Sequence, residues 1–394
     1  MSHLSVRQSV LFRLGPLTLS RISVSFAAIA AVWLTVASPH AEVIALIAVT
    51  AMAVVGHAGR AAAGQRPATS IEWDLVVCGI IGEFLVYPAI AAAVVFHPGA
   101  QLGLAGGSLN GTFVAGFGGA GTAGVWRLAI IAAILAVLTA MVDVCVHGPA
   151  LSGTRLWRFG PPGDVRLPVA CAAVLVFGAR AAFLVVLVLG VAALCAVLVD
   201  GVRLAPDRGE LRGYRGDGRI AVWIGKWVEG KVPPFPPLAV GLLVTGVLAA
   251  LGLHNLSGIL LLTPVEAMLL AAFASWHPHN GRSDWLVPPL LQAAEYLFLA
   301  EIGYAGHAWP PLTFALVAAV GLRHLDLAYR VRGNLADGID RRAFGWEGRM
   351  IIAGVAAAVG IVPLAYTALA LYLWWRVARD WMIGWSARHP AINR

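Results

Sequence analysis

The sequence predicts an all-α polytopic membrane protein of about twelve transmembrane helices, arranged as two parallel six-helix repeats. Three observations favour this fold class. Of 394 residues, 59% are hydrophobic and only 12% are charged, whereas soluble domains are roughly 45–50% apolar and about 25% charged. The apolar residues gather in long runs, and the few polar residues recur at matching places in the two halves.

Twelve apolar runs are candidates for membrane crossings, because a helix needs about 20 apolar residues to cross the hydrocarbon core. Several runs are shorter, so they must extend into their flanks or pack inside the bundle. Gly360 and Pro363 lie where the last two runs meet, and we expect a tight hairpin there. In chain order the runs cover residues 22–37, 41–56, 74–96, 126–146, 167–180, 183–200, 238–253, 257–275, 285–304, 311–329, 350–361 and 363–377.

Basic residues orient the chain, because Lys and Arg gather in cytoplasmic loops. Of the 28 Lys and Arg residues, all but Arg127 and Arg180 fall on one side of a twelve-crossing arrangement. This predicts a multi-pass protein of the cell inner (cytoplasmic) membrane with both termini in the cytoplasm. The net charge of +8 is then an orientation signal, and we expect no nucleic-acid partner.

The domain organisation follows from the runs and from one amphipathic segment. Residues 1–203 form the first six-helix unit and residues 237–394 form the second, which carries the main polar cluster. Between them, residues 204–236 are a cytoplasmic linker. Within it, Trp223 and Trp227 recur at helical spacing with Arg219 and Lys226 among the polar positions, which predicts a helix lying in the headgroup layer.

An internal repeat is indicated by polar and aromatic residues, since matches within Ala, Leu and Val runs arise by chance. An even number of crossings in each unit makes the two repeats parallel, related by an axis along the membrane normal. The matched pairs are Trp73 with Trp285, Glu83 with Glu295, Asp143 with Asp326, and Arg166 with Arg349.

Acidic residues inside apolar runs are costly in a membrane and suggest function. Glu83, Glu295 and Asp143 are the intramembrane candidates. Pairing with an arginine, or a hydrogen bond to a neighbouring helix, explains such residues equally well.

A second polar cluster lies at the predicted cytoplasmic ends of three helices in the second unit. Arginine binds phosphate oxygens bidentately, and carboxylates or histidines move protons or hold metals. Arginine at a cytoplasmic helix end also anchors topology, and that is its commoner role. The residues predicted to bind a phosphate or lipid head are Arg282, Arg323, Arg330, Arg349, His277 and Asn280. The predicted catalytic residues are Asp284, His279 and Asp326.

A resemblance to known proteins rests on three segments of the second half: HPHNGRSDWLVPPLLQAAEYL at 277–297, RHLDLAYR at 323–330 and FGWEGR at 344–349. These resemble an uncharacterised actinobacterial membrane domain found C-terminal in fusions with a nucleotidyltransferase and a CDP-alcohol phosphatidyltransferase. The amphipathic helix followed by six crossings also resembles CDP-alcohol phosphatidyltransferases, which transfer a phospho-group to an alcohol using Mg²⁺. Their signature DxxDGxxAR…GxxxDxxxD is absent from both halves, so the resemblance implies a degenerate relative.

Three functional hypotheses follow. The first is a lipid-linked transferase, or its degenerate relative, acting on or binding a phospholipid or isoprenoid-phosphate at the cytoplasmic face, with Mg²⁺ as the candidate ion. The second is a transporter or flippase built on the two repeats, with Glu83 and Glu295 facing each other. The third is a non-catalytic membrane subunit of a lipid or cell-wall enzyme. The expected partners are membrane lipids and a protein of lipid or cell-wall biosynthesis.

Overall fold

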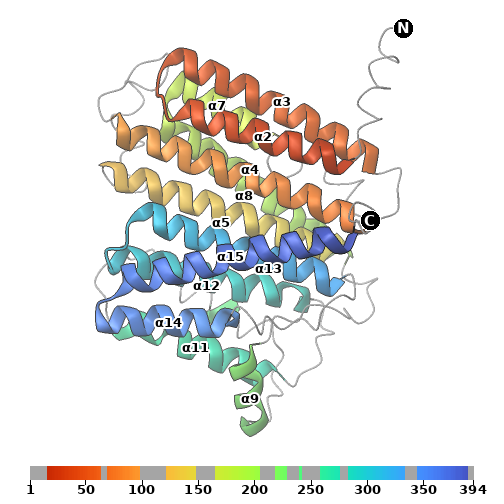
Figure 1. Cartoon of the computed structure of the whole chain (residues 1–394). Coiled ribbons are helices and arrows are strands. Elements are labelled where there is room, and N and C mark those ends of the chain that lie inside the picture. The colour runs from red at the N-terminus through yellow and green to blue at the C-terminus, as the bar shows by residue number, and fades with distance from the viewer. Residues whose placement is uncertain are drawn as a thin grey trace. The chain divides into compact units, whose positions relative to one another are not determined.

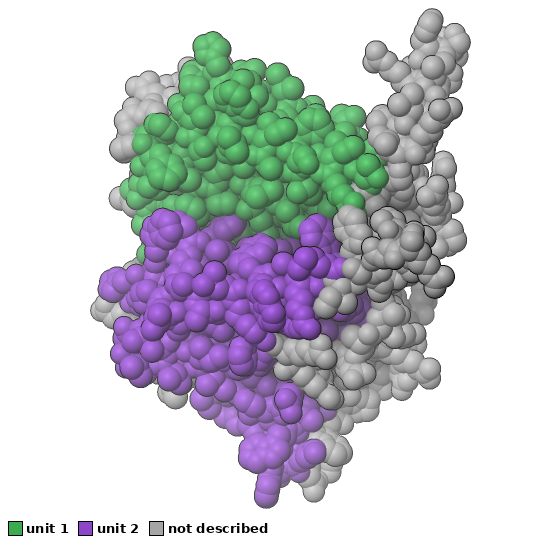
Figure 2. All heavy atoms as spheres, in the orientation of Figure 1, with its two compact units in different colours: residues 1–204 green, residues 205–394 purple. Residues whose placement is uncertain are grey.

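The computed structural model describes residues 16–63, 69–97, 121–147, 165–204, 218–228, 239–241, 258–275, 283–332 and 344–388. The described residues form helices joined by turns and contain no strand, which confirms the all-α class. The chain divides into two compact units, residues 1–204 and 205–394, which Figure 2 colours green and purple.

Unit 1 is a bundle whose helices contact one another in a continuous chain. Helix α2 packs on α3 and α4, α4 packs on α5, and α5 packs on α8. The short helix α7 lies against both α3 and α8. In sequence order the helices are α2 (Pro16–Leu34), α3 (Pro39–Ala63), α4 (Thr69–Phe96), α5 (Gly121–His147), α7 (Arg166–Phe177) and α8 (Ala179–Leu204).

Unit 2 has a similar order of long and short helices, preceded by one that contains only ten residues. Helix α12 packs on α13 and α14, α13 packs on α15, and α11 contacts both α9 and α14. In Figure 1 the helices α11 to α15 lie side by side, and α9 projects from the end of α11. They are α9 (Arg219–Val228), α11 (Gly258–Ala274), the 3₁₀ turn η3 (Asp284–Leu286), α12 (Val287–Ala305), α13 (Pro310–Arg332), α14 (Gly345–Val359) and α15 (Val362–Arg388).

A sharp turn separates the last two helices of each unit. Gly178, between α7 and α8, has φ of 88°, and Gly360, between α14 and α15, has φ of 78°. Glycine adopts this left-handed region without the steric penalty of a Cβ atom. The bend expected near Gly360 and Pro363 is therefore confirmed, and it divides the last apolar stretch into two helices that pack on each other.

Five of the described helices contain a segment long and apolar enough to cross a membrane. Large apolar side chains such as Val32, Val188 and Leu371 are also more than 60% exposed, which suits contact with lipid better than contact with water. Both observations are compatible with a membrane protein. The five segments are Pro39–Gly59, Val76–Phe96, Gly121–Val146, Ala179–Arg203 and Pro310–Val331.

Candidate functional site

The charged side chains of unit 2 concentrate toward one end of its helices, which we call the polar end. At this end α13 finishes at Arg332, α14 starts at Gly345 and α15 approaches its last residue, Arg388. The predicted polar residues of 323–349 all lie on these helices. The fold therefore brings together side chains that the sequence separates by more than 50 residues.

A buried ion pair joins α12 to α14 near the polar end. Arg349 Nε donates to Glu295 Oε1 at 2.6 Å, and Arg349 Nη2 donates to Glu295 Oε2 at 3.1 Å. Both residues are buried, with 1% of the Arg349 side chain and 0% of the Glu295 side chain exposed. This bidentate geometry is the strongest arrangement available to an arginine and a carboxylate, so the pair is a fixed connection between the two helices.

His324 on α13 extends this pair to a third helix. Its Nε2 lies 2.8 Å from Arg349 Nη2, and its Nδ1 lies 2.8 Å from the Tyr296 hydroxyl. Arginine has no acceptor atom, so Nε2 must accept the hydrogen bond. The proton is then assigned to Nδ1, which donates to Tyr296 Oη. His324 is therefore the neutral imidazole in this geometry.

Unit 1 contains a buried ion pair between the corresponding residues, although neither Glu83 carboxylate oxygen meets the geometry of a hydrogen bond within the described residues. Arg166, the first residue of α7, places Nη2 2.9 Å from Glu83 Oε1 on α4. The two side chains are 7% and 0% exposed. One turn after Glu83, Tyr87 is also fully buried and meets the edge of Phe183. The intramembrane candidates Glu83 and Glu295 are therefore each paired with an arginine of their own unit.

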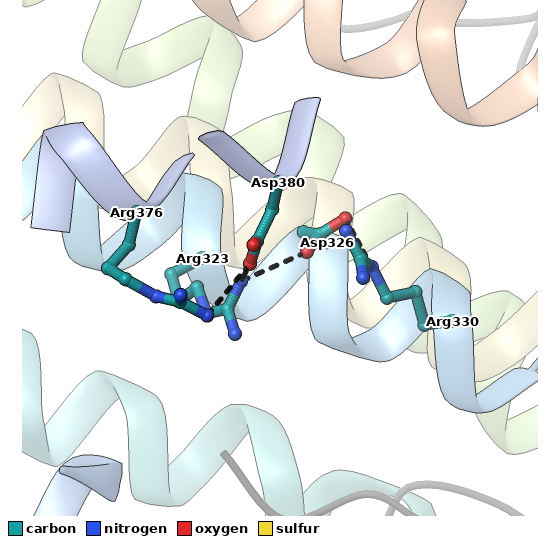
Figure 3. Close-up of polar contacts among 5 residues, drawn as sticks. All are labelled: Arg323, Asp326, Arg330, Arg376 and Asp380. Carbon is teal, nitrogen blue, oxygen red and sulfur yellow. Dashed lines mark hydrogen bonds and ion pairs between the residues drawn. The ribbon is translucent and has the colours of Figure 1, made fainter. Parts of the chain in front are cut away.

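A larger polar network joins α13 to α15 at the polar end (Figure 3). Arg323 Nη1 lies 2.6 Å from Asp380 Oδ2 and 3.3 Å from Asp326 Oδ2. Arg330 Nε lies 2.9 Å from Asp326 Oδ1, and Arg376 Nη2 lies 3.3 Å from Asp380 Oδ2. We call these five residues the arginine cluster.

The arginine cluster is partly open, and among its five residues the arginines outnumber the aspartates. Its three arginines face two aspartates, which leaves one positive charge without a carboxylate inside the cluster. Arg330 exposes 38% of its side chain, whereas Arg323 and Arg376 expose 9% and 4%. Guanidinium groups in such an arrangement can bind an anion.

The short helix α9 is held on unit 2 by Glu347. The carboxylate accepts the backbone N–H of Ile220 at 2.9 Å and that of Ala221 at 2.6 Å. These amides belong to the first turn of α9, where they have no partner within the helix. Burial raises the pKa of the Glu347 carboxyl above its usual value, and the amide donors oppose that rise.

The face that α9 turns to the bundle carries small residues. Gly218, Ala221 and Gly225 are buried. A Cβ atom at Gly218 would collide with the Glu347 carboxylate, and one at Gly225 would collide with Ser275. The tryptophans face outward instead, with Trp223 59% and Trp227 77% exposed. The predicted helix is present, and its indoles are free to contact a membrane.

The other predicted site residues lie on several different helices or outside the described part of the chain. Asp284 is buried at the start of η3, and Asp143 is buried near the end of α5. The predicted phosphate ligand Arg349 is fully buried in its pair with Glu295. Four predicted residues lie outside the described part of the chain: His277, His279, Asn280 and Arg282.

Several functional contacts involve residues that sequence reasoning did not select as site residues. Arg376 and Asp380 complete the arginine cluster, and their spacing of four residues is a signal for a pair on one helix. Arg166 was matched with Arg349 as evidence of the repeat, and nothing in the sequence assigned it a role of its own. Glu347 gave no signal, because its partners are backbone amides 126 and 127 residues away.

Metal binding was a further expectation for this site. Within the described residues, no group of three or more His, Cys, Asp or Glu side chains could hold a metal ion. The carboxylates of Asp326 and Asp380 both contact arginines. The chemistry that the described geometry offers is the binding of a negative charge by guanidinium groups.

The buried pairs make a first testable prediction. Replacing Arg349 by Met leaves Glu295 buried without its cation, which typically costs about 3–5 kcal/mol. We expect a large fall in the thermal unfolding midpoint of the purified protein in detergent, and a similar fall for Arg166→Met in unit 1. The double variant Glu295→Gln/Arg349→Met leaves no unpaired charge, so it should be more stable than Arg349→Met. A midpoint for Arg349→Met no lower than that of the control Arg379→Gln would contradict the structural role.

The Glu347 cap makes a second prediction. Loss of a helix cap costs about 1 kcal/mol, so Glu347→Ala should speed hydrogen exchange of the first amides of α9 about fivefold. The measurement is hydrogen–deuterium exchange mass spectrometry on the peptide that covers 219–228. Glu347→Gln keeps an acceptor oxygen and should have a smaller effect. Unchanged exchange in Glu347→Ala would show that the carboxylate does not hold α9.

Comparison with known proteins places part of the chain in context. No curated protein and no solved structure matches it. The comparisons add no similarity to CDP-alcohol phosphatidyltransferases, so that resemblance stays a prediction. Residues 208–392, which cover almost all of unit 2, match the model of a family of unknown function, DUF5941.

Proposed function

We propose that this protein is an integral membrane protein that binds a phospho-lipid, such as a phospholipid or an isoprenoid-phosphate, at the polar end of unit 2. The observation that carries the proposal is the charge imbalance of the arginine cluster, in which three arginines face two aspartates. Because the arginines outnumber the aspartates in these described contacts, the cluster attracts a further negative charge. A lipid phosphate supplies that charge and presents oxygen atoms that match guanidinium geometry.

The exposed residues of helix α9 support the proposal that binding takes place in the headgroup layer of the membrane. The outward face of this helix carries Trp223 and Trp227 with Arg219 and Lys226, all exposed. Tryptophan is enriched at membrane interfaces, and basic residues there attract anionic lipids. Glu347 joins α9 to the start of α14, so α9 and the polar end belong at the same level of the membrane.

We also infer that the chain crosses the inner membrane twelve times in two parallel six-helix repeats, with both termini in the cytoplasm. The matched residues support this. Glu83 and Arg166 pair in unit 1, and their sequence counterparts Glu295 and Arg349 pair in unit 2. The helix contacts support it too. The pairs α4–α5, α5–α8 and α3–α7 have counterparts in α12–α13, α13–α15 and α11–α14.

The other hypotheses derive less support from the described residues. Transport through a site where Glu83 faces Glu295 needs carboxylates that can change partners, yet each is paired with a buried arginine of its own unit. Group transfer would depend on His279, which lies outside the described residues, and on Asp284, which is buried at the start of η3. A subunit role in a lipid or cell-wall enzyme is compatible with lipid binding, and transfer, transport and partner binding all stay predictions.

Lipid binding at the arginine cluster predicts a selective loss of bound lipid. Each arginine near an anionic lipid surface contributes about 1 kcal/mol, so Arg330→Gln should weaken retention of phosphatidic acid about fivefold. Native mass spectrometry of the purified full chain, titrated with phosphatidic acid and with phosphatidylcholine, measures this. The matched control is Arg379→Gln, which removes the same charge from α15 outside the cluster. Equal retention of both lipids by the wild-type protein would contradict the proposed function.

A further inference from the structure

Asp380 occupies an unusual position within the arginine cluster. Its Oδ2 atom lies 2.6 Å from Arg323 Nη1 and 3.3 Å from Arg376 Nη2, so one carboxylate oxygen serves two guanidinium groups from two helices. Figure 3 shows Asp380 and Arg376 extending from α15 toward Arg323 on α13. The carboxylate therefore stands where any other anion shared by these two arginines would have to bind.

The Asp380 carboxylate leaves one buried donor of Arg376 without a hydrogen bond in the described part of the chain. Arg376 is 3% exposed, and its buried Nε has no hydrogen-bond partner among the described residues. A buried donor of a charged group that lacks a partner is energetically costly. A phosphate group offers more acceptor oxygens than one carboxylate, so it could contact Arg323 and also bind the Nε–H and Nη–H groups of Arg376 bidentately.

Two residues of the arginine cluster are partly exposed, so an anion can reach the cluster from outside the protein. Asp380 exposes 13% of its side chain and Arg330 exposes 38%. On α15, the exposed ring of Trp375 lies 5.9 Å from the Arg376 guanidinium carbon. An interfacial aromatic beside a basic site suits the headgroup region of a lipid. An anion that approaches the partly exposed Asp380 would thus meet Arg323 and Arg376 after displacing the Asp380 carboxylate.

We propose that Asp380 is an internal stand-in for a lipid phosphate: it neutralises Arg323 and Arg376 in the free protein and is displaced when a phosphate-bearing headgroup binds between them. The inference rests on the proposed function and deepens it by naming the subsite. The inference also predicts in which direction the affinity for the ligand changes when Asp380 is replaced. If Asp380 competes with the ligand, removing its charge strengthens binding, whereas a merely structural Asp380 gives no such gain.

The test uses native mass spectrometry of the full chain titrated with phosphatidic acid. We expect Asp380→Asn to bind phosphatidic acid at least threefold more tightly than the wild-type protein. Arg376→Gln should bind it more weakly, and Asp380→Asn/Arg376→Gln should lose the gain. The matched control is Asp200→Asn on α8, which makes the same change in net charge in unit 1 and should bind as the wild-type protein does.

The outcomes separate the two proposals. If Asp380→Asn binds no more tightly than the wild-type protein or Asp200→Asn, the stand-in role is overturned, while lipid binding survives as long as Arg330→Gln still weakens retention. If the wild-type protein does not prefer phosphatidic acid to phosphatidylcholine, the proposed function itself is lost. Inorganic phosphate is titrated in parallel. A gain for phosphate equal to that for the lipid supports the subsite and assigns it to a soluble anion.

A measurement on the wild-type chain covers the case in which Asp380→Asn does not fold. Carbodiimide labelling of carboxyl groups, read by peptide mass spectrometry, reports the accessibility of Asp380. Displacement by phosphatidic acid should increase labelling of Asp380 at least twofold and leave Asp200 unchanged. Labelling of Asp380 that stays constant or falls on addition of phosphatidic acid would overturn the inference.

Discussion

The central constraint on this fold is that charge buried in an apolar bundle must find its counter-charge within reach. Water is not available to solvate a carboxylate or a guanidinium there. Arg349 and Glu295 meet this constraint completely, with two hydrogen bonds between fully buried groups. Arg166 and Glu83 form the corresponding ion pair in unit 1. Each pair ties a short helix, α14 or α7, to a long one.

From the same constraint we infer which part of the protein binds a ligand. The paired carboxylates deep in the units have their counter-charges, and changing their partners would cost several kcal/mol. The arginine cluster is different, because its three arginines outnumber its two aspartates. In addition, one buried donor of Arg376 has no hydrogen-bond partner in the described contacts. We infer that a ligand completes the pairing there. Helix α9, capped by Glu347, adds a face with exposed indoles and cations that suits the membrane surface.

Much of the helical architecture could be predicted from the sequence, because apolar runs and bends are local signals. The bend at Gly360 and the helix at 219–228 are present. The pairing of charges could be predicted only in part. The repeat matched Glu83 with Glu295 and Arg166 with Arg349, but nothing local reveals that Asp380 meets Arg323 across 57 residues. The packing of α9 through Gly218 and Gly225 was also hidden, since a glycine at a close contact resembles any other glycine in sequence.

The most direct test of this account is an electron cryo-microscopy map of the full chain in nanodiscs that contain phosphatidic acid. The account predicts phosphate density within about 3 Å of the Arg323 and Arg376 guanidinium groups, with Asp380 turned away from both. A map in which Asp380 still bridges the two arginines, while every lipid phosphate lies elsewhere, would contradict it.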